Sequence, residues 1–282
     1  MRTVDSGAPT VGVVTVTYNS NRYFEAYLRA LQAQTLPPTK VVVVDSGSPD
    51  AAFLQRADDF DLETDVVIET NVGFAAGSNV GWRRVRTMDY VLFLNPDAFP
   101  PPEFLQQATA YMDAHPDVGM VTPTLLRFDM QAMQPLDMVD TTGVVRGRLG
   151  LLAERDGGAP RATLQKYTGP NDVPWLCAAV ALARREAMEA VVEHDAQIFD
   201  ESFFMYKEDT DLAWRVRRAG WRLVHLPALV GYHCRGWQQR STMSRALRLM
   251  TARNEVKMCV KNRSPFLLVG VAKYLLVLLF NL

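Results

Sequence analysis

Short apolar runs and amphipathic stretches alternate along the first 124 residues of the chain. The runs are rich in valine, and most of them lead directly into a cluster of turn-forming residues. Because β-rich runs bounded by turn formers indicate strands, we predict that these runs form buried β-strands. Strands are expected at residues 11–17, 40–45, 65–69, 90–94 and 118–122.

The intervals between these runs carry apolar side chains at helical spacing. Helices are expected at residues 22–34, 75–87 and 102–114, and Pro37 and Pro38 end the first of them. Strands that alternate with helices form a mainly parallel sheet with helices on both faces and right-handed crossovers. The pattern therefore predicts an α/β fold.

The pattern changes after residue 124. Residues 125–172 contain several glycines and charged residues but no long apolar run, so we predict a loop or hairpin insertion that is partly mobile. Regular structure resumes over residues 175–191 and 199–220, and two short strands are expected in the sequences WRLVHL and LVGYH.

The C-terminal part has a different character. Residues 241–262 are expected to form a basic helix, and residues 266–280 are apolar except for Lys273. A run of 15 residues is too short for a comfortable bilayer span, which needs about 20 residues. An interfacial helix on an anionic membrane surface, a core helix, a truncated span and a homodimer contact all remain open.

The composition disfavours several classes of protein. The chain has 30 basic and 31 acidic residues and a formal net charge of −1, so no overall positive field favours nucleic acid. Cys177, Cys234 and Cys259 have no CxxC spacing, which disfavours a disulfide framework or a zinc site and fits a reducing cytoplasm. The N-terminus has no apolar signal core, so secretion is not expected.

Polar residues follow four of the predicted strands. They are Thr17, Tyr18 and Asn19, then Asp45, then Asn71 to Phe74, and finally Asp97. The carboxyl ends of parallel strands meet at one edge of the sheet, where ligands bind in open α/β folds. One aspartate at a strand end is ordinarily a turn former or a helix cap, but four polar clusters at the same edge indicate a shared crevice. The first loop lacks GxGxxG and the chain lacks GxxxxGK[ST], which disfavours a dinucleotide site and excludes a P-loop.

Residues 90–97, with the sequence YVLFLNPD, are the most informative part of this edge. Pro96 ends the strand because proline lacks the N–H that a central strand needs, and Asp97 is left just beyond the sheet. A carboxylate there suits a hard divalent cation, and a cation there suits a diphosphate.

These motifs and the later ones carry a family resemblance. The order VVTVTYN, VVVVDSGSPD, NVGFAAGSNVG, FLNPDA, WLCAAVALARREA, FFMYKEDTDLAWRVRRAGW and VGYH resembles family 2 glycosyltransferases over residues 11–237. It is most similar to the bacterial rhamnosyltransferase-like branch. The resemblance implies the GT-A fold, in which a mainly parallel nucleotide-binding sheet is joined to a smaller acceptor-side subregion, here with C-terminal helices, and it implies an inverting mechanism.

The resemblance also implies roles for individual residues. Asp45 would read the nucleotide base or the ribose, and Asp97 would hold the metal ion. The family's metal motif is often Asp-x-Asp, whereas this chain has Asn95 at the first position, where it is expected to orient the loop or to hydrogen-bond the donor. The other donor-site residues implied in this way are Thr17, Tyr18, Asn19, Asn71, Gly73 and Asn79.

The catalytic base is expected in the sequence KEDTD. Acidic side chains at a helix start are stabilised by the helix dipole by about 0.3–1 kcal/mol each, which explains some of Glu208, Asp209 and Asp211. The apolar FFMY before them would bury them against the cleft, where burial and neighbouring carboxylates raise one pKa toward a useful value. The family match favours Asp209 over Glu208, whereas Asp211 is expected to cap the helix or to pair with Arg215.

The remaining candidates each have a structural alternative. His233 is expected either to complete the metal coordination or to satisfy a buried carbonyl, and a neutral imidazole suits Mn²⁺ better than Mg²⁺. Trp175 would stack on the acceptor or lie in the core, and Cys177 lies on the acceptor side, where the family often carries glycine. Arg235 and Trp237 are expected to close over the donor diphosphate.

These interpretations divide the chain into a catalytic domain and a helical region. Residues 1–237 would form the GT-A domain, with residues 10–124 as the nucleotide-sugar half and residues 173–237 as the acceptor-binding and base-bearing half. Residues 238–282 would form the C-terminal helical region. A cytoplasmic protein is expected, and contact with the inner face of the cell membrane stays open.

The predicted function is an inverting glycosyltransferase that depends on Mg²⁺ or Mn²⁺, because one base and a metal-held leaving group suffice for a single displacement. The resemblance suggests dTDP-L-rhamnose as the donor and a cell-envelope glycan or lipid-linked sugar as the acceptor, with a UDP-hexose or UDP-galactofuranose as the alternative donor. A sugar-1-phosphate nucleotidyltransferase should carry an early glycine-rich phosphate loop, but residues 17–22 contain no glycine. A non-catalytic nucleotide-sugar binder is the remaining class.

Overall fold

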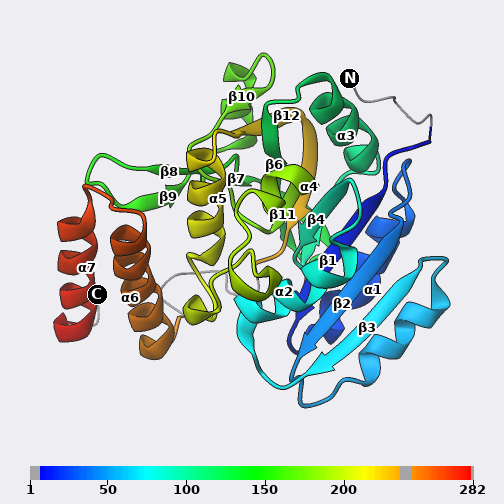
Figure 1. Cartoon of the computed structure of the whole chain (residues 1–282), viewed down its shortest axis with the longest axis horizontal. Helices are drawn as coiled ribbons and strands as arrows, with labels where there is room; N and C mark the ends of the chain where they lie inside the picture. The colour runs from blue at the N-terminus through cyan, green and yellow to red at the C-terminus, as the bar shows by residue number, and fades with distance from the viewer. Residues whose placement is uncertain (1–6, 236–242, 281–282) are drawn as a thin grey trace.

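The computed structural model describes residues 7–235 and 243–280 of the chain. A large twisted sheet lies in the middle, with helices on both of its faces and two C-terminal helices at one side (Figure 1). The strands are β1 (Val11–Thr17), β2 (Lys40–Ser46), β3 (Thr64–Glu69), β4 (Tyr90–Leu94), β5 (Ala98–Phe99), β6 (Val118–Asp129), β7 (Gln134–Thr141), β8 (Val144–Arg146), β9 (Leu152–Glu154), β10 (Asn171–Asp172), β11 (Val180–Arg184) and β12 (Arg222–His233). The α-helices are α1 (Asn21–Gln32), α2 (Gly73–Val85), α3 (Phe104–Ala114), α4 (Arg185–Glu189), α5 (Glu208–Arg218), α6 (Arg245–Lys261) and α7 (Leu267–Phe280), and short 3₁₀ helices cover Ala52–Asp59, Arg161–Lys166, His194–Ala196 and Glu201–Phe203.

The order of strands in the large sheet is β10-β12-β6-β11-β4-β1-β2-β3, with β5 and β7 paired beside this path. Strands β4, β1, β2 and β3 are parallel to one another, and their register places Thr17 opposite Asp45. Strand β11 runs antiparallel between β4 and β6. The parallel half therefore brings the carboxyl ends of β1 to β4 to one edge of the sheet.

Alternation along the strands builds a core on each face of the sheet. Val13 of β1 belongs to the apolar cluster that contains Phe24 of α1, whereas its neighbour Val14 belongs to the opposite cluster, with Trp82 of α2. The α/β fold class predicted from the sequence is confirmed, because every predicted strand and helix of the first 124 residues is present.

The insertion over residues 125–172 is more regular than a loop. Strand β6 continues to Asp129 and pairs antiparallel with β7, and β8 and β9 form a second hairpin. The first four residues of β7 are exposed, so no apolar run marks this strand in the sequence. Of the two alternatives predicted for this insertion, loop or hairpin, the structure shows hairpins.

The two strands predicted in WRLVHL and LVGYH are one strand of 12 residues, β12. Its register with β6 shifts between Leu226 and Val230, and Pro227 falls in this irregular stretch, where its missing N–H disrupts no ladder. The far end of β12 places His233 opposite Ala98 of β5. This pairing connects the end of β12 to the loop that follows β4.

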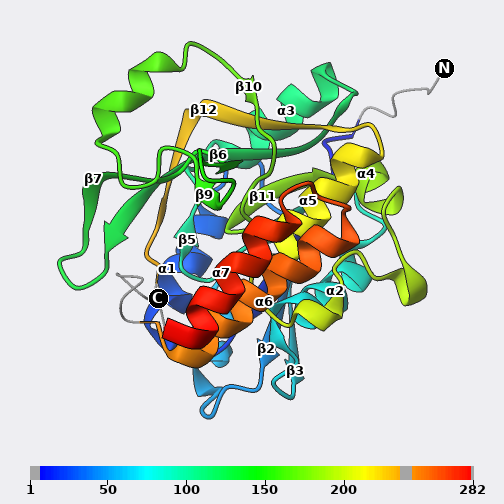
Figure 2. The ribbon, with the colours of Figure 1, turned by 90° about the vertical axis from the view of Figure 1, so that its left-hand side faces the viewer.

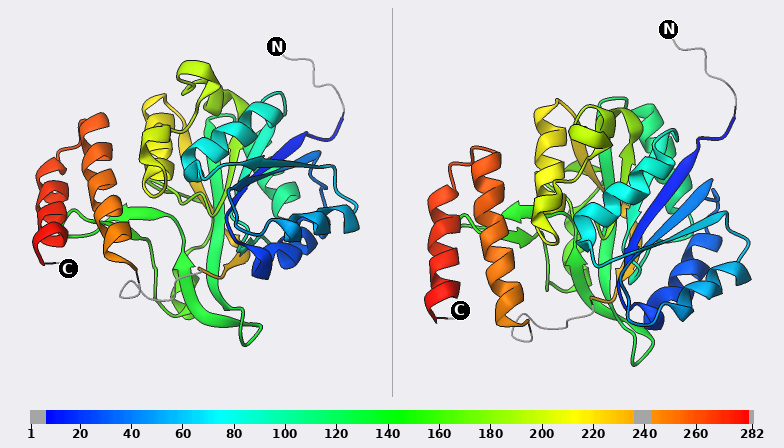
Figure 3. Two further views of the ribbon diagram at one scale, coloured as in Figure 1. Left: turned by 90° about the horizontal axis from the view of Figure 1, so that it is seen from below. Right: turned by 60° about the horizontal axis from the view of Figure 1, so that its bottom comes forward.

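Helices α6 and α7 lie side by side at the end of the molecule opposite β3 (Figures 2 and 3). Ser244 caps α6 by accepting a hydrogen bond from the Leu247 N–H at 3.3 Å. Phe203 packs with Met258 and Cys259 in a small apolar cluster that joins α6 to the segment before α5. Within the residues that the structure describes, none of the helices combines the length and the apolar character needed to cross a bilayer.

Two sequence predictions fall where the structure is not described. Trp237 and the predicted domain boundary between residues 237 and 238 both lie in residues 236–242, outside the described ranges. The division into domains therefore stays a prediction.

Candidate active site

The loops that follow β1 and β2 are joined by hydrogen bonds at the carboxyl edge of the sheet. Both oxygens of the buried Asp45 carboxylate accept hydrogen bonds from Ser48, from its N–H at 2.9 Å and from its hydroxyl at 2.5 Å. The same hydroxyl accepts the N–H of Asn19 at 2.7 Å. Asp45 therefore holds the two loops together. Its side chain is 0% exposed, and the nucleotide contact expected of it stays a prediction.

The loop after β3 is attached to the same edge. The Ser46 hydroxyl accepts the N–H of Gly73 at 3.0 Å and lies 3.4 Å from Oδ1 of Asn71. Gly73 has a φ of +79°, and a Cβ atom there would lie 2.5 Å from the ring of Phe204. Glycine is required at this position because the backbone is left-handed and the next segment approaches closely.

The end of β1 presents two residues with different exposure. Tyr18 is 54% exposed, so its ring is accessible at the edge of the sheet. The hydroxyl of Thr17 is buried and has no hydrogen-bond partner among the described residues. An unpaired buried hydroxyl costs free energy unless a ligand or water satisfies it, which fits the donor contact predicted for Thr17.

Asp97 lies against the end of β12. Its carbonyl accepts the N–H of Cys234 at 2.9 Å, and its Oδ1 lies 3.4 Å from Nε2 of His233. Burial alone would raise the pKa of Asp97, but His233 holds it below the ordinary value. The structure therefore brings together the two residues to which the sequence analysis assigned the metal, and their role stays a prediction.

His233 is held from its other side by Asp140. Its Nδ1 lies 2.9 Å from Oδ2 of Asp140, a carboxylate at the end of β7 that is 1% exposed. Burial opposes the charged imidazole, but Asp97 and Asp140 together raise the pKa of His233 to about 10. Asp140 thus fixes the ring so that Nε2 points toward Asp97.

Sequence reasoning missed Asp140. The residue follows the short apolar pair Met138-Val139 and ends a strand, which is the same signal that identified Asp45 and Asp97. The signal is weak because the preceding residues of β7 are exposed. Arg235, which was predicted near the donor, donates to Oδ1 of Asp140 and lies 3.2 Å from Glu154 of β9.

Asp97 and His233 would together hold a divalent cation only if His233 gave up its Nε2 proton, because the raised pKa of His233 keeps the ring charged near neutral pH. Among the described residues no group of three or more His, Cys, Asp or Glu side chains could hold a metal by itself. A cation held there would take its other ligands from the diphosphate and from water, as Mg²⁺ ordinarily does with phosphates. The imidazole favours Mn²⁺ within this choice. Asn95 shapes the loop through its backbone, since its N–H donates to Ala179 O at 3.0 Å.

Asp209 lies in the first turn of α5, half-buried. Its Oδ2 accepts the N–H of Ala178 at 3.3 Å, and its Oδ1 accepts the N–H of Thr210 at 2.6 Å. Glu208 differs from it, because Glu208 is 5% exposed and its Oε2 has no hydrogen-bond partner among the described residues. Burial, followed by the charge of Asp209, raises the pKa of Glu208 well above the ordinary value. Asp209 is thus the better placed of the two to accept a proton.

Backbone hydrogen bonds connect the two sides of the site. Asp209 Oδ2 accepts the N–H of Ala178, and the carbonyl of the next residue, Ala179, accepts the N–H of Asn95 at 3.0 Å, two residues before Asp97. Burial raises the pKa of the Cys177 thiol, which precedes Ala178 in the sequence. The loop that carries Asp97 and the carboxylate of Asp209 are therefore both held by residues 178 and 179.

Two predicted ligand-binding residues lie deep in the protein. Asn79 is 0% exposed, and its amide uses all its hydrogen-bonding groups on residues 198–201. It therefore anchors that segment and has no free group for direct donor contact, which differs from the prediction. Trp175 is 8% exposed and packs against Trp214 with ring centres 5.1 Å apart, so the larger part of its indole faces protein.

A comparison with protein families identifies the chain. Residues 12–192, more than half of its length, match the family described as glycosyl transferase family 2. The chain belongs to this family. It is a glycosyltransferase, as the sequence motifs predicted.

Curated relatives of this glycosyltransferase include rhamnosyltransferases. It is 29% identical over 241 residues to N-acetylglucosaminyl-diphospho-decaprenol L-rhamnosyltransferase of Mycobacterium tuberculosis, a match that covers 78% of this chain and 75% of the relative. It is 25% identical over 248 residues to rhamnosyltransferase WbbL of Escherichia coli, covering 84% and 88% of the two chains.

Solved structures share the fold. The mannosyltransferase PcManGT from Pyrobaculum calidifontis, in complex with GDP-Man and Mn²⁺, superposes with a TM-score of 0.62 at 22% sequence identity. The similarity covers 97% of this chain and 71% of that chain. The predicted GT-A fold is confirmed.

Proposed function

We propose that this glycosyltransferase moves L-rhamnose from dTDP-L-rhamnose to a hydroxyl of a cell-envelope glycan or a lipid-linked saccharide, with inversion at the anomeric carbon. The observation that carries the proposal is that the segment Ala178–Ala179 contacts both sides of the site, since Ala178 donates to the Asp209 carboxylate and Ala179 accepts the N–H of Asn95 in the loop that carries Asp97. The names of the relatives from Mycobacterium tuberculosis and Escherichia coli support the choice of sugar.

The chemistry needs one base and one neutralised leaving group. Asp209 accepts the proton of the acceptor hydroxyl while the acceptor oxygen forms a bond to the anomeric carbon. The bond from that carbon to the nucleoside diphosphate breaks, and its electron pair leaves with the diphosphate. A divalent cation held by Asp97 and His233 would supply Lewis-acid neutralisation of the diphosphate. One displacement of this kind inverts the configuration.

A donor panel tests the proposal. The protein is incubated with dTDP-L-rhamnose, a UDP-hexose, UDP-galactofuranose or GDP-mannose, each with Mg²⁺, Mn²⁺ or EDTA and a diphospho-lipid N-acetylglucosamine acceptor. We expect release of dTDP that requires the metal, and a product whose anomeric configuration by NMR is opposite to that of the donor. Preference for a UDP-sugar would replace dTDP-L-rhamnose as the proposed donor. Retention of the anomeric configuration would refute the single displacement. No nucleoside diphosphate release from any donor would refute the proposal as a whole.

The lipid-linked acceptor named for one relative directs attention to α7. This helix of 14 residues is apolar, and much of its apolar surface is exposed. We propose that this surface rests on the anionic inner face of the cell membrane, because an apolar helix beside basic residues such as Arg245 and Arg263 has the character of an interfacial anchor. The exposed residues are Leu268, Leu275, Leu276, Leu278, Leu279 and Phe280.

Sedimentation with lipid vesicles tests this surface. The double substitution Leu268→Glu/Leu279→Glu should abolish binding to phosphatidylglycerol vesicles, since these residues are 80% and 68% exposed. Ile68→Glu is the matched control, because Ile68 is also 68% exposed but lies on β3 at the other end of the molecule. An equal loss of vesicle binding in both variants would refute the proposed membrane contact. Concentration-dependent dimers without vesicle binding would instead assign the exposed face of α7 to a homodimer interface.

A further inference from the structure

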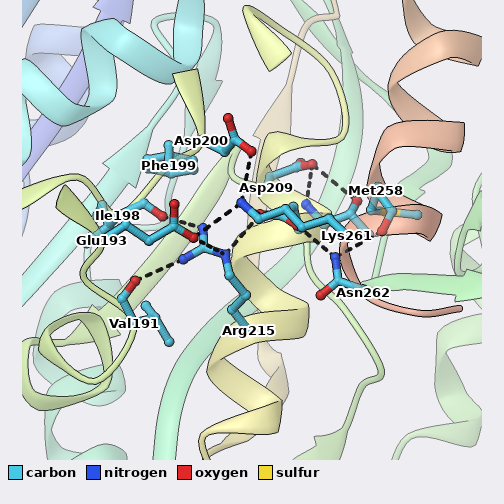
Figure 4. Close-up of polar contacts among 12 residues, drawn as sticks. Val191, Glu193, Ile198, Phe199, Asp200, Asp209, Arg215, Met258, Lys261 and Asn262 are labelled. Carbon is cyan, nitrogen blue, oxygen red and sulfur yellow. Dashed lines mark hydrogen bonds and ion pairs between the residues drawn. The ribbon is translucent and has the colours of Figure 1, made fainter. Parts of the chain in front are cut away.

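Helix α6, the first of the two C-terminal helices, contacts the segment of residues 200–207 that precedes the candidate base Asp209. In the sequence α6 follows β12, yet one of its faces lies against residues 200–207. Figure 4 shows one of these contacts, between Lys261 and Asp200. That segment also touches the donor side, because the carbonyl of Phe204 accepts the N–H of Ala75 at 3.1 Å. Asp209 follows two residues after it. The segment is therefore the structural connection between the donor loop and the base.

The end of this segment has an unusual backbone. Phe204, Tyr206 and Lys207 have φ values of 64°, 68° and 77°, in the left-handed region that favours glycine. Lys207 is the N-cap residue of α5. Non-glycine residues persist in this conformation only where the surrounding structure holds them. The contacts that hold this segment therefore determine where α5 and Asp209 begin.

Asn254 of α6 supplies the central contact. Its side chain is 0% exposed, and its Nδ2 lies 2.8 Å from the carbonyl of Phe203, 2.9 Å from that of Met205 and 3.1 Å from that of Tyr206. Three carbonyl groups of one short segment thus converge on a single donor group. An asparagine is suited to this position because its amide carries two N–H bonds and no charge.

The same face of α6 continues toward its C-terminus. Lys257 donates to the carbonyl of Ser202 at 2.6 Å, one turn beyond Asn254. One turn further, Lys261 lies 2.9 Å from Asp200 and 3.2 Å from Asp211. Each contact is made to the segment before α5 or to α5 itself.

Asp211 shows how closely α6 and α5 are joined. Its carboxylate is 0% exposed, and it accepts hydrogen bonds from Asn262 at 2.7 Å and from Arg215 at 2.9 Å. A buried carboxylate requires such partners. Two of the groups around it, Lys261 and Asn262, come from the end of α6.

We propose that α6 is part of the catalytic unit and that Asn254 is a positioning residue for the base. By holding the carbonyls of Phe203, Met205 and Tyr206, Asn254 fixes the left-handed segment and thereby places the Asp209 carboxylate against the N–H of Ala178. Asn254 acts through Asp209 and touches neither nucleotide nor sugar. The inference rests on the proposed function only in taking Asp209 as the base.

Three variants of the full chain test the proposal. Asn254→Asp is isosteric but replaces the N–H donors with an acceptor, and Lys257→Met removes a second contact at a less buried position. Val260→Ala is the control, because Val260 lies on the same helix and is 58% exposed. Each variant is examined by amide hydrogen exchange of residues 200–209 and by steady-state kinetics with the donor that the wild type uses.

We expect faster exchange of residues 200–209 in Asn254→Asp and a kcat lower by roughly 10- to 100-fold, since a small misplacement of a reacting group costs that much. Donor KM should stay within about twofold, because ground-state donor binding is not the function of this contact. Lys257→Met should change both quantities in the same direction by less, and Val260→Ala should change neither.

Each outcome supports or overturns the positioning role of α6. If circular dichroism shows that Asn254→Asp does not fold, the hydrogen exchange and the kcat of Lys257→Met test that role instead. Wild-type exchange or wild-type kcat in the folded variants overturns the proposal, as does an equal loss in Val260→Ala. If the wild type releases no nucleoside diphosphate from any donor, the proposed function fails, and hydrogen exchange alone still decides whether α6 holds the segment.

Discussion

Asp97 and Asp209 are held in place by different kinds of structure. Asp97 lies three residues beyond the end of β4 and directly before β5, so the pairing of β5 with β12 holds its position. Asp209 lies in a helix that begins after a left-handed segment, and contacts from α6 hold that segment. One side of the site is therefore built from neighbouring strands, and the other depends on a helix far along the chain.

This difference implies that the two sides fail in different ways. A change at the sheet edge should weaken metal and donor binding together, because the proposed cation would itself bind the diphosphate of the donor. A change around α5 should lower the rate of the chemical step while donor binding persists. Kinetics that separate kcat from KM can therefore assign a substitution to one side or the other.

Asp97→Asn should have the largest effect on the strand-built side. The amide lacks the charge that a cation needs, so we expect kcat/KM to fall by about 10⁴-fold, as the loss of several kcal/mol of charge stabilisation implies. Nucleoside diphosphate release as a function of Mn²⁺ concentration measures this, with thermal unfolding as the check of folding. Turnover at the wild-type level would remove Asp97 from the site.

Asp209→Asn tests the other side. Loss of a general base should lower kcat by about 10³-fold, within the usual range for proton transfer. Calorimetric titration with dTDP and Mn²⁺ should give the wild-type affinity, since the residue does not hold the cation. A parallel loss of nucleotide affinity would mean that Asp209 binds the donor instead.

Asp140→Asn should have an intermediate effect on the strand-built side. The carboxylate fixes the His233 ring from a distance of 2.9 Å, so its loss should weaken Mn²⁺ activation by about 10- to 100-fold. The control is Asp137→Asn, because Asp137 lies on the exposed part of the same strand. Equal metal titration curves for Asp140→Asn and Asp137→Asn would exclude the orienting role.

Glu208→Gln should give the smallest effect, on stability rather than on rate. Burial raises the pKa of Glu208 in the folded protein, so the carboxyl is neutral there at pH values where it is ionised in the unfolded chain. The free energy of unfolding should therefore fall as pH rises above the ordinary glutamate range, by up to about 1.4 kcal/mol per pH unit. Glutamine does not titrate, so the variant should lose less stability over this interval in urea unfolding curves, whereas parallel curves would contradict the buried neutral form.

The strand-built side was predictable because its signals are local. An apolar run followed by a polar residue marks the ends of β1, β2 and β4, and the sheet topology brings Asp45 and Asp97 to one edge without further information. The pairing of β5 with β12 that sets His233 beside Asp97 connects residues more than 130 positions apart, and only the family resemblance pointed to it.

The helix-held side could not be predicted in the same way. Asn254 binds backbone carbonyls, which every residue possesses, so its partners leave no mark in the sequence.

Asp140, on the strand-built side, was also missed. The first residues of its strand are exposed, so no apolar run reveals the strand in the sequence. For Asn79 the error was the opposite one, because a structural residue was predicted to bind the donor. Its side chain accepts the backbone N–H groups of Ile198 and Phe199.

The contacts of α6 also determine where this protein can be shortened. The family match ends at residue 192 and the sequence resemblance ends at residue 237, so a truncation placed after Trp237 would retain every residue with an expected chemical role. It would also strip the fully buried Asp211 of Lys261 and Asn262. A shortened version of the protein, whether for expression or for chimaeras with related enzymes, therefore has to extend through residue 262.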